Sequence, residues 1–434
     1  MENIFITGIE QEEKARAVLV SVFPKGEDPE EHEASLDELE RLLETAGGEC
    51  FARLVQNKEH PDNATYIGSG KLDELKTLCN TGGCELVIFD AELSPSQIRN
   101  IEKALGDEEK DIMVIDRSML ILDIFALHAV TGEGKAQVEL AQIKYTSPRL
   151  IGKGKQLSRL GGGIGTRGPG ESKLEQDRRH LARRAAALEK EIAEMARSRE
   201  VQRKQRDNTG MTKIAIAGYT NAGKSTLLNR LTDAGILAED KLFATLDPTT
   251  RKFSLPSGND ILLTDTVGFI RNLPHHLIKA FRSTLDEVKY ADAIVVMIDA
   301  ADPQSAAHLE VTQTLLAELE AGDKPTVYVL NKCDKLEGGV VFPVGVLGGG
   351  KEIVMMSALS GEGVDDLIEK LERIAGEGKK RVELFIPNSK LGVLDMVYKN
   401  GSDIDVEYTP DGARISVVLD VASIGRLSEY KVGE

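Results

Sequence analysis

Residues 218–225 read GYTNAGKS and match the phosphate-loop pattern GxxxxGKS at every fixed position. The apolar run KIAIAGY (213–219) leads into this stretch and the helical pattern KSTLLNRL (224–231) leaves it. In such a loop, backbone N–H groups surround the phosphates, the lysine places positive charge beside the β- and γ-phosphates, and the serine hydroxyl binds Mg²⁺. The stretch therefore predicts a phosphate-binding α/β domain. The alternative, a glycine-rich turn with a chance lysine, is disfavoured by the flanking strand and helix.

Two further segments carry polar groups that belong near such a loop. Asp265 opens DTVG (265–268) directly after the apolar strand ILLT, where its carboxylate can reach the magnesium shell and Gly268 can bring a backbone N–H to the γ-phosphate. Thr245, within FATLDPTTR (243–251), offers Mg²⁺ a second hydroxyl when a γ-phosphate is present. The alternative for Thr245 is an ordinary solvated loop residue.

The base is specified by two segments later in the chain. NKCD (331–334) follows an apolar strand, and its aspartate can accept hydrogen bonds from guanine N1–H and the 2-amino group, where adenine has no donors. SAL (357–359) follows the next strand and can place the Ala358 N–H on guanine O6. The substrate is therefore predicted to be GTP, with Mg²⁺ as cofactor bound by Ser225 and Thr245. The predicted nucleotide-binding residues are Gly218, Tyr219, Thr220, Asn221, Ala222, Gly223, Lys224, Ser225, Thr226, Phe243, Ala244, Thr245, Leu246, Asp247, Asp265, Thr266, Val267, Gly268, Asn331, Lys332, Asp334, Ser357, Ala358 and Leu359.

Phe269 follows DTVG at the position where small G proteins such as Ras place a glutamine that orients the attacking water. A phenyl ring cannot hydrogen-bond to water, so slow intrinsic GTP hydrolysis is expected. A nearby polar residue, or a partner that orders the loops, must then position the water. The sequence alone assigns no catalytic residue.

The chain divides into four predicted parts. Residues 1–132 alternate apolar runs with amphipathic stretches and are expected to form an α/β domain. Residues 133–208 carry Leu174, Leu181, Leu188 and Met195 at seven-residue steps, which predicts a helical hairpin whose second helix pairs with residues 133–147. Residues 209–376 are predicted to form the doubly wound, mostly parallel phosphate-loop domain. Residues 377–434 are predicted to form a small α+β domain of βαββ order, with a turn at 410–412.

Local signals predict where several helices begin. Ser35, with Glu38 three residues on, and Ser94, ahead of an apolar periodic run, are predicted helix starts. GSGK (68–71) and GEGK (132–135) resemble fragments of a phosphate loop but lack its full spacing. Turns at helix starts are the better interpretation of both.

Charge is distributed unevenly on this acidic chain of net charge −17. Residues 149–184 contain ten Lys/Arg against three Asp/Glu, a local charge of +7 that leaves −24 for the rest. The stretch includes the glycine-rich run LIGKGKQLSRLGGGIGTRGPGES (150–172), which predicts an irregular, basic hairpin tip suited to folded RNA. A solvated charged helix with a mobile loop is the alternative. The predicted RNA-binding residues are Arg149, Lys153, Lys155, Arg159, Arg167, Lys173, Arg178 and Arg179.

Composition argues against several other classes of protein. The four cysteines form no CxxC pair and have no His at metal-ligand spacing, so neither a zinc site nor a disulfide framework is expected. Trp is absent and aromatics make up 4%, which disfavours base stacking as the main binding mode. The start MENIFITGIEQEEK lacks a signal-peptide pattern, and no run approaches the roughly 18 apolar residues of a membrane span. A cytoplasmic protein, in part ribosome- or membrane-associated and monomeric when free, is expected.

These segments resemble the HflX family within the TrmE-Era-Obg-HflX group of GTPases. The motifs GYTNAGKS, FATLDPTTR, DTVGF, NKCD and SAL match the wider group, whereas LSRLGGGIGTRGPGESKLEQDRR (157–179), joined to the heptad helices, is specific to HflX. The resemblance is strongest from residue 123 to 359 and weakest after 375. It implies a GTPase that binds the large ribosomal subunit, its N-terminal domain and hairpin reaching toward the peptidyl transferase centre. It further implies the splitting of stalled or idle ribosomes under heat or other stress.

Other functions are compatible with parts of the sequence. An ATP- or GTP-dependent RNA-remodelling enzyme would use the N-terminal domain for a purine nucleotide, yet residues 1–150 contain no complete phosphate loop. A non-ribosomal regulator would bind a protein through the heptad seam. A G protein of tRNA modification would carry a reactive cysteine near its C-terminus, and no Cys follows Cys333.

Overall fold

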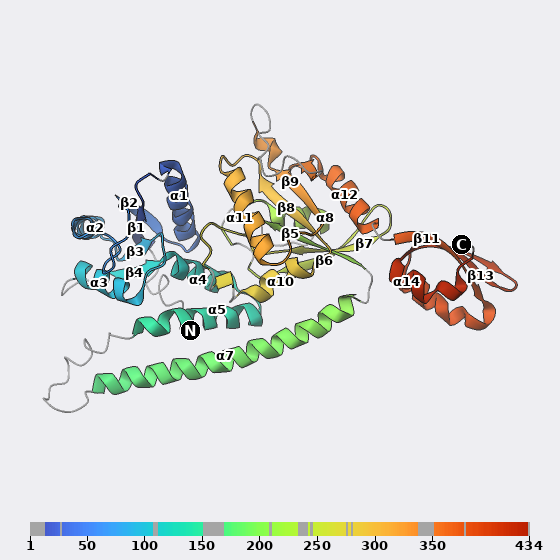
Figure 1. Ribbon diagram of the computed structural model, residues 1–434, viewed down its shortest axis with the longest axis horizontal. Coiled ribbons are helices and arrows are strands. Elements are labelled where there is room, and N and C mark those ends of the chain that lie inside the picture. Colours follow the sequence, from blue (N-terminus) through green and yellow to red (C-terminus); the bar gives the residue numbers. More distant parts are fainter. Residues whose placement is uncertain are drawn as a thin grey trace. The chain divides into compact units, whose positions relative to one another are not determined.

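The computed structural model describes residues 14–26, 28–106, 112–150, 169–207, 211–232, 242–243, 246–274, 277–278, 281–336, 351–376 and 379–432 (Figure 1). Its contacts divide the chain into two compact units. The first comprises Met1–Met195, Glu239–Asp247 and Ile270–Ser283, and the second Ala196–Ala238, Pro248–Phe269 and Thr284–Glu434. Two short segments from within the predicted phosphate-loop domain therefore belong with the N-terminal unit, a division that the sequence did not predict.

The N-terminal unit is built on a parallel sheet of order β2-β1-β3-β4. Its strands are β1 (Arg16–Phe23), β2 (Glu49–Asn57), β3 (Leu86–Phe89) and β4 (Met113–Asp116). The connecting helices are α1 (Pro29–Thr45), α2 (Ser69–Gly82) and α3 (Pro95–Leu105), and α4 (Arg117–His128) follows the last strand. Apolar residues of both faces, such as Val18 and Leu19, are fully buried, as expected for a parallel sheet between helices. The expected α/β architecture is confirmed.

Three of the four predicted helix starts are confirmed and one is wrong. Ser94 caps α3, accepting a hydrogen bond from the Gln97 N–H, and its own N–H donates to the Gln97 side chain. GSGK (68–71) and GEGK (132–135) both lie at helix starts, because α2 begins at Ser69 and α5 (Gly132–Thr146) at Gly132. Ser35 lies inside α1, which instead begins at Pro29 behind the capping carboxylate of Asp28.

A helical hairpin joins α5 to the long helix α7 (Pro169–Asp207), with the 3₁₀ turn η1 (Ser147–Leu150) after α5. Leu188 is buried against Ala136 and Ile143 of α5, and Leu181 and Ile192 pack around them. Two ion pairs cross the same seam, Arg184 to Glu139 at 2.6 Å and Lys144 to Glu189 at 2.8 Å. The predicted pairing is confirmed. The side chain of Leu174 and the glycine-rich segment 151–168 lie outside the described residues.

The second unit contains the doubly wound domain. Its sheet has the order β10-β9-β8-β5-β7-β6, parallel except for β6. In chain order the strands and helices are β5 (Thr212–Gly218), α8 (Lys224–Thr232), β6 (Thr249–Ser254), β7 (Asp260–Asp265), α10 (Arg282–Tyr290), β8 (Ala293–Asp299), α11 (Ser305–Glu318), β9 (Thr326–Asn331), η3 (Cys333–Lys335), β10 (Glu352–Met355) and α12 (Val364–Gly376). The predicted fold class is confirmed. The predicted site segments follow the carboxyl ends of these strands, where ligands bind in such sheets.

The C-terminal part of the chain forms an antiparallel sheet of order β11-β13-β12 (Figure 1). Its elements are β11 (Lys379–Pro387), η4 (Asn388–Val393), α13 (Leu394–Asn400), β12 (Ser402–Thr409), β13 (Gly412–Asp420), α14 (Val421–Arg426) and η5 (Ser428–Tyr430). The predicted βαββ order is confirmed, the turn at 410–412 joins β12 to β13, and α14 is an addition. Alternate residues Val382, Leu384 and Ile386 are buried with those of β13, so one face of the sheet forms a small core.

In the described part of the chain, no helix combines the length and the apolar composition that crossing a membrane requires.

Candidate nucleotide-binding site

The loop between β5 and α8 has the backbone that GYTNAGKS predicts. Asn221 and Gly223 adopt left-handed conformations, with φ of 60° and 96°. A Cβ on Gly223 would lie 2.2 Å from Asn331 Nδ2, so glycine is required both for this φ and for the close approach of the strand that carries NKCD. The loop then enters α8 at Lys224, whose first-turn N–H groups are available to phosphate oxygens.

Lys224 is held inside the loop. Its ammonium donates hydrogen bonds to the carbonyl oxygens of Tyr219 at 2.8 Å and Gly218 at 3.2 Å. The residue is only 7% exposed. Burial lowers the pKa of Lys224 to about 8, and the nearby carboxylate of Asp265 opposes this shift. A cation that is poorly solvated and surrounded by neutral carbonyls is prepared for an anionic ligand.

A hydroxyl and a carboxylate meet where α8 begins and β7 ends. Ser225 Oγ donates to Asp265 Oδ2 at 2.6 Å, and Asp265 is fully buried. Hard oxygen donors of this kind suit Mg²⁺, which takes one or two protein ligands and completes its shell with phosphate oxygens and water. Among the described residues, no group of three or more His, Cys, Asp or Glu is placed to hold a metal. The pair therefore fits a Mg²⁺ whose other ligands come from a bound nucleotide and from water.

Of the residues that follow Asp265, two are buried in the domain and one lies beside the phosphate loop. Thr266 is buried, and its hydroxyl donates to Ile216 O at 2.8 Å, which joins β7 to β5. Val267 is buried as well. The Cβ position of Gly268 lies 3.1 Å from Lys224 Nζ, so this backbone reaches the phosphate loop. Of the predicted DTVG residues, Asp265 and Gly268 lie at the site, whereas Thr266 and Val267 support it.

Asn331 joins the base-recognition segments to the phosphate loop. Its Nδ2 donates to Ala222 O at 2.8 Å, and its Oδ1 accepts from the Ala358 N–H at 2.8 Å. The N–H that the sequence predicts for guanine O6 is thus already used, so guanine must share or replace that bond. Asp334 lies exposed in η3, where its carboxylate is accessible to a base. Lys332 has a left-handed φ of 64°, and its ammonium lies 2.7 Å from Asp299 Oδ2.

Arg230 is a residue of this site that the sequence reasoning missed. It lies on α8, donates from Nε to Ala358 O at 2.8 Å, and also donates to Leu359 O. Ser357 N–H donates to Glu362 O and the Ser357 hydroxyl accepts from Ser360 N–H, which closes the same turn. Leu359 itself is 71% exposed. No spacing rule links residue 230 to residues 358 and 359, so only the fold reveals this contact.

Tyr219 and Thr226 take different positions around the loop. The Tyr219 ring is buried and stacks on His308 of α11, with centroids 3.8 Å apart. Thr226 lies in the first turn of α8 and is half-buried. Tyr219 therefore braces the loop through its side chain, and its carbonyl accepts from Lys224.

The predicted segment FATLDPTTR is described in part, and its start belongs with the N-terminal unit. Phe243 and Leu246 are buried, and the Phe243 ring meets Phe125 of α4 edge to face at 4.8 Å. The Asp247 carboxylate accepts hydrogen bonds from the N–H groups of Val130 and Thr131, each at 2.8 Å, and from the Thr131 hydroxyl at 2.6 Å. It therefore holds Thr131, the N-cap residue of α5, whose hydroxyl accepts from the Gly134 N–H at 3.0 Å, a role that differs from the predicted nucleotide contact. Ala244 and Thr245 lie outside the described residues.

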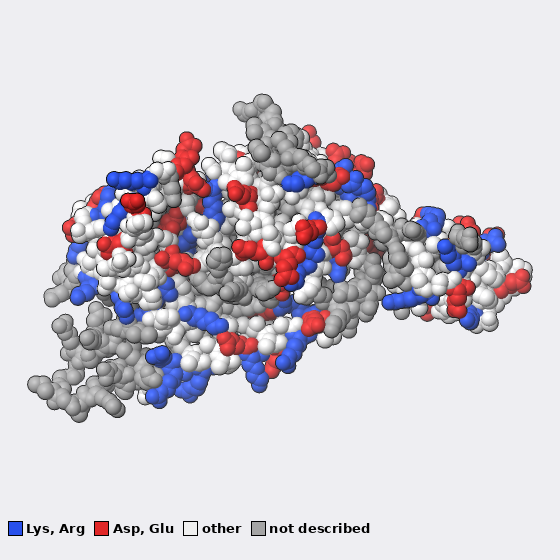
Figure 2. All heavy atoms as spheres, viewed as in Figure 1, with Lys and Arg blue, Asp and Glu red and all other residues white. Residues whose placement is uncertain are grey.

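The predicted RNA-binding residues differ in exposure and contacts. Arg178 and Arg179 are exposed, and Figure 2 shows Lys and Arg gathered over the described start of α7. Arg149 instead has an internal role, because its guanidinium donates to Leu93 O at 3.2 Å and Asp116 Oδ2 at 3.3 Å and stacks on Tyr145. This differs from the prediction of an RNA contact. Four of the predicted residues, and the side chain of Lys173, lie outside the described residues: Lys153, Lys155, Arg159 and Arg167.

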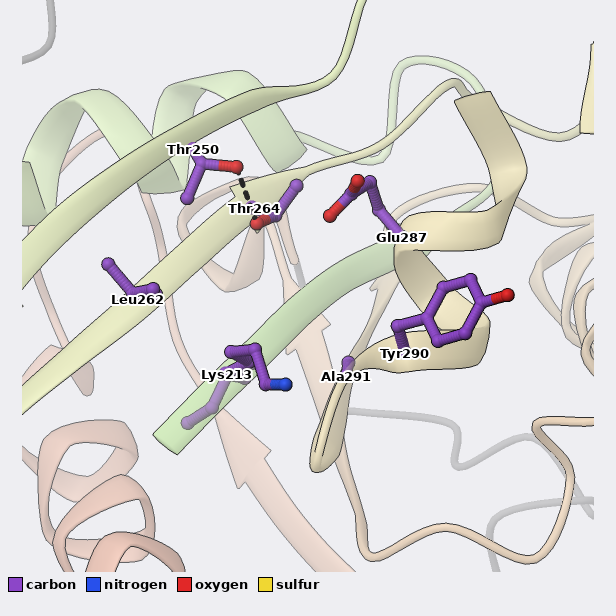
Figure 3. A pocket seen from close by; sticks show the side chains of 8 residues that line it. Lys213, Thr250, Leu262, Thr264, Glu287, Tyr290 and Ala291 are labelled. Carbon is purple, nitrogen blue, oxygen red and sulfur yellow. Dashed lines mark hydrogen bonds between the residues drawn. The ribbon is translucent and has the colours of Figure 1, made fainter. Parts of the chain in front are cut away.

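A small cavity lies elsewhere in the same domain. Lys213, Thr250, Thr264, Glu287 and Tyr290 are among its lining residues, and the Thr250 and Thr264 hydroxyls lie 2.9 Å apart (Figure 3). Its volume of about 20 Å³ accommodates one water molecule. Lys213 lies at the amino end of β5, whereas the phosphate loop follows the carboxyl end. The cavity is therefore distinct from the nucleotide site and too small for a nucleotide.

Three family models match successive parts of the chain. They are described as GTP-binding GTPase N-terminal (residues 33–126), GTP-binding GTPase Middle Region (residues 128–206) and 50S ribosome-binding GTPase (residues 213–332). The chain is 50% identical to the GTPase HflX of Lacrimispora saccharolytica, with 94% of each chain covered. It is 41% identical to the GTPase HflX of Escherichia coli K12, with 83% of each covered.

Solved structures of GTP-binding proteins also align with the chain. One is a GTP-binding protein from the archaeon Sulfolobus solfataricus in complex with GDP, at 27% identity and a TM-score of 0.43, covering 84% of this chain and 99% of that one. The bacterial relatives align with this chain over most of the length of both chains. This chain belongs to the HflX family of GTPases.

Proposed function

We propose that this GTPase binds the large ribosomal subunit and, when GTP is bound, separates the subunits of stalled or idle ribosomes, notably under stress. The observation that supports the proposal most directly is the match of residues 213–332 to the family model described as a 50S ribosome-binding GTPase. The exposed cations at the start of α7 add a surface suited to ribosomal RNA. Because ribosomes are cytoplasmic, the protein is proposed to act there.

The nucleotide site is proposed to work through residues of the second unit together with Thr245. Lys224 and the loop N–H groups bind the β- and γ-phosphates, and Asp334 with Ala358 reads guanine. Ser225 and Thr245 bind the Mg²⁺, which supplies charge neutralisation between the phosphates when bound. Asp265 and Gly268 respond to the γ-phosphate. Hydrolysis then removes that contact, and the loops relax so that the protein leaves the ribosome.

Subunit separation is tested by light scattering. Intact ribosomes are mixed with saturating protein and either GTP, a non-hydrolysable GTP analogue or GDP. Scattering is expected to fall with GTP and the analogue and to stay near the buffer control with GDP. Co-sedimentation of the protein with isolated large subunits in the same nucleotides tests binding separately. If saturating protein produces no separation beyond buffer, the splitting function is rejected, whatever the binding result.

Guanine recognition is tested with Asp334→Ala. The variant loses the carboxylate that pairs with two guanine donors, so GDP affinity should fall by at least about 100-fold, while a variant of the exposed Asp411, Asp411→Ala, keeps it. Isothermal titration with GDP and with ADP measures the ratio. A preference for guanine that survives in Asp334→Ala would contradict the assignment.

A further inference from the structure

The side chain that follows DTVG is turned away from the phosphate loop. Phe269 N–H donates to Gly218 O at 3.1 Å, and Phe269 O accepts from Thr220 N–H at 2.8 Å. This pairing places the phenyl ring in the core, where it is 1% exposed. Phe269 therefore cannot hold the attacking water, and the group that does must come from elsewhere in the site.

Thr220 is the side chain closest to Gly268. Around the point where a Cβ on Gly268 would lie, the nearest atoms are Thr220 Cγ2 at 2.6 Å, Thr220 Cα at 2.9 Å and Lys224 Nζ at 3.1 Å. Gly268 and Lys224 are the two groups that the phosphate-loop assignment places at the γ-phosphate. Thr220 therefore lies at the end of the loop where the terminal phosphoryl group reacts.

The Thr220 hydroxyl is buried. The residue is 6% exposed, and Oγ1 has no hydrogen-bond partner among the described residues. Buried hydroxyls are almost always paired, because leaving one unpaired costs free energy. By contrast, the buried hydroxyl of Thr266, in the same domain, donates to Ile216 O. An unpaired hydroxyl at this position indicates a group that acquires its partner when the substrate is bound.

A change of the χ1 angle of Thr220 can bring its hydroxyl to the side of Gly268. The methyl and hydroxyl groups are both attached to Cβ, so one step of χ1, about 120°, carries Oγ1 to the position that Cγ2 now has beside Gly268. The same step carries the methyl group to the position of the Cβ hydrogen, and the hydroxyl, which is no larger than a methyl group, fits where Cγ2 now lies. The hydroxyl can therefore reach the side of the site that faces Gly268.

We propose that the Thr220 hydroxyl positions the attacking water during GTP hydrolysis, in place of the glutamine that Phe269 replaces. The proposal rests on the phosphate-loop assignment above. Thr220 Oγ1 accepts a hydrogen bond from the water, whose oxygen forms a bond to Pγ. The bond between Pγ and the β–γ bridging oxygen breaks, and that oxygen keeps the electron pair on the departing GDP. The water proton passes to a γ-phosphate oxygen, and Thr220 remains neutral throughout.

The test compares Thr220→Val, which keeps the shape and removes the hydroxyl, with Thr220→Ser, which keeps the hydroxyl. Thr326→Val is the matched control, a half-buried threonine of β9 whose hydroxyl bonds to Lys324 O. Single-turnover GTP hydrolysis is measured in each variant. So are the dissociation constants for GDP, a non-hydrolysable GTP analogue, and GDP with aluminium fluoride, which mimics the transferring phosphoryl group.

Thr220→Val is expected to lower the single-turnover rate about 10- to 100-fold, with affinities for GDP and the GTP analogue within about twofold of the wild type. Affinity for GDP with aluminium fluoride should fall in step with the rate, and Thr220→Ser should recover most of it. Thr326→Val should behave as the wild type. A Thr220→Val protein that hydrolyses GTP at the wild-type rate overturns the proposal. So does one whose rate and nucleotide affinities fall equally, since that marks a packing role.

These outcomes are distinguishable from failure of the proposed function. If the wild-type protein binds no guanine nucleotide, the phosphate-loop assignment fails before Thr220 is reached. If it binds and hydrolyses GTP but does not separate ribosomes, the ribosomal proposal fails while the Thr220 test stands.

Discussion

Lys224 shows how a single side chain is prepared for an anion. Burial lowers its pKa to about 8. Phosphate oxygens stabilise the charged form, so bound nucleotide should raise that pKa again. Nucleotide binding should then be accompanied by proton uptake once the pH exceeds about 8. The affinity for GDP should be highest below this pH and decrease as the pH rises above it.

This prediction is checked by calorimetry in two buffers of different ionisation enthalpy. The proton uptake due to Lys224 should be near zero at pH 6.5 and clearly positive at pH 8.5. Lys213→Met, which removes a lysine at the other end of β5, should leave this proton uptake unchanged. Equal heats in both buffers at pH 8.5 would show that Lys224 is charged before the nucleotide arrives.

Arg230 holds the turn that is proposed to read guanine. Its bonds to Ala358 O and Leu359 O hold the turn that presents the Ala358 N–H. Arg230→Met removes these bonds and should lower the affinity for GDP about tenfold. The affinity for 6-thio-GDP, whose sulfur is a poor acceptor for that N–H, should fall much less. Arg414→Met, the same change at an exposed position of β13, is the control. An equal loss for both nucleotides would indicate general destabilisation of the turn instead.

At the scale of elements, the start of α5 depends on a residue far away in sequence. Asp247 accepts from Val130 N–H and Thr131 N–H, at separations of 117 and 116 residues. The contact is tight, because a Cβ on Gly134 would lie 2.6 Å from Asp247 Oδ1. A carboxylate at a helix N-terminus both fills hydrogen bonds and opposes the helix dipole.

Asp247→Ala should therefore destabilise the start of α5 by about 1–2 kcal/mol. Hydrogen exchange of the Val130 and Thr131 amides should become at least about tenfold faster. Asp247→Asn keeps a hydrogen-bond acceptor but loses the charge, so its exchange rates should lie between those of the wild type and Asp247→Ala. Exchange that is unchanged in Asp247→Ala would mean that the cap contributes nothing to the stability of this helix in solution.

The same elements show where sequence patterns fail. Ser35 has the spacing of a capping box, yet α1 begins six residues earlier, because Asp28 and Pro29 supply a cap and a first-turn proline. The Ser35 hydroxyl instead donates to Asp90 Oδ2 at 2.6 Å. A short pattern describes only neighbours in sequence, and several overlapping patterns compete for one helix end.

At the scale of the whole molecule, charge is concentrated on one helix of an acidic chain. Exposed cations at the start of α7 should neutralise RNA phosphates and release counterions, so binding should weaken with salt. Replacing Arg178 and Arg179 together by Gln should lower affinity for large subunits at low salt. It should also make the slope of log K against log salt less steep by about 1–2.

Lys190 and Arg197 provide the control, because they are exposed on the same helix beyond the basic stretch 149–184. Replacing both by Gln changes the net charge equally and should leave the slope nearly unchanged. Co-sedimentation with large subunits across a salt series gives the slopes. Equal effects of the two double variants would assign the salt dependence to net charge and would remove support for a specific RNA surface.

The sequence by itself determined the nucleotide class, the α/β fold and the helical hairpin of this chain. The phosphate loop and the heptads are patterns in which neighbouring residues act together, so short-range order in the sequence is sufficient to specify them. Only the tertiary structure decided that Arg149 binds Asp116, that Asp247 holds the N-cap residue of α5 and that Arg230 holds the turn at Ala358, 128 residues away. Such contacts depend on which chain segments packing brings together, and no periodicity in the sequence encodes that.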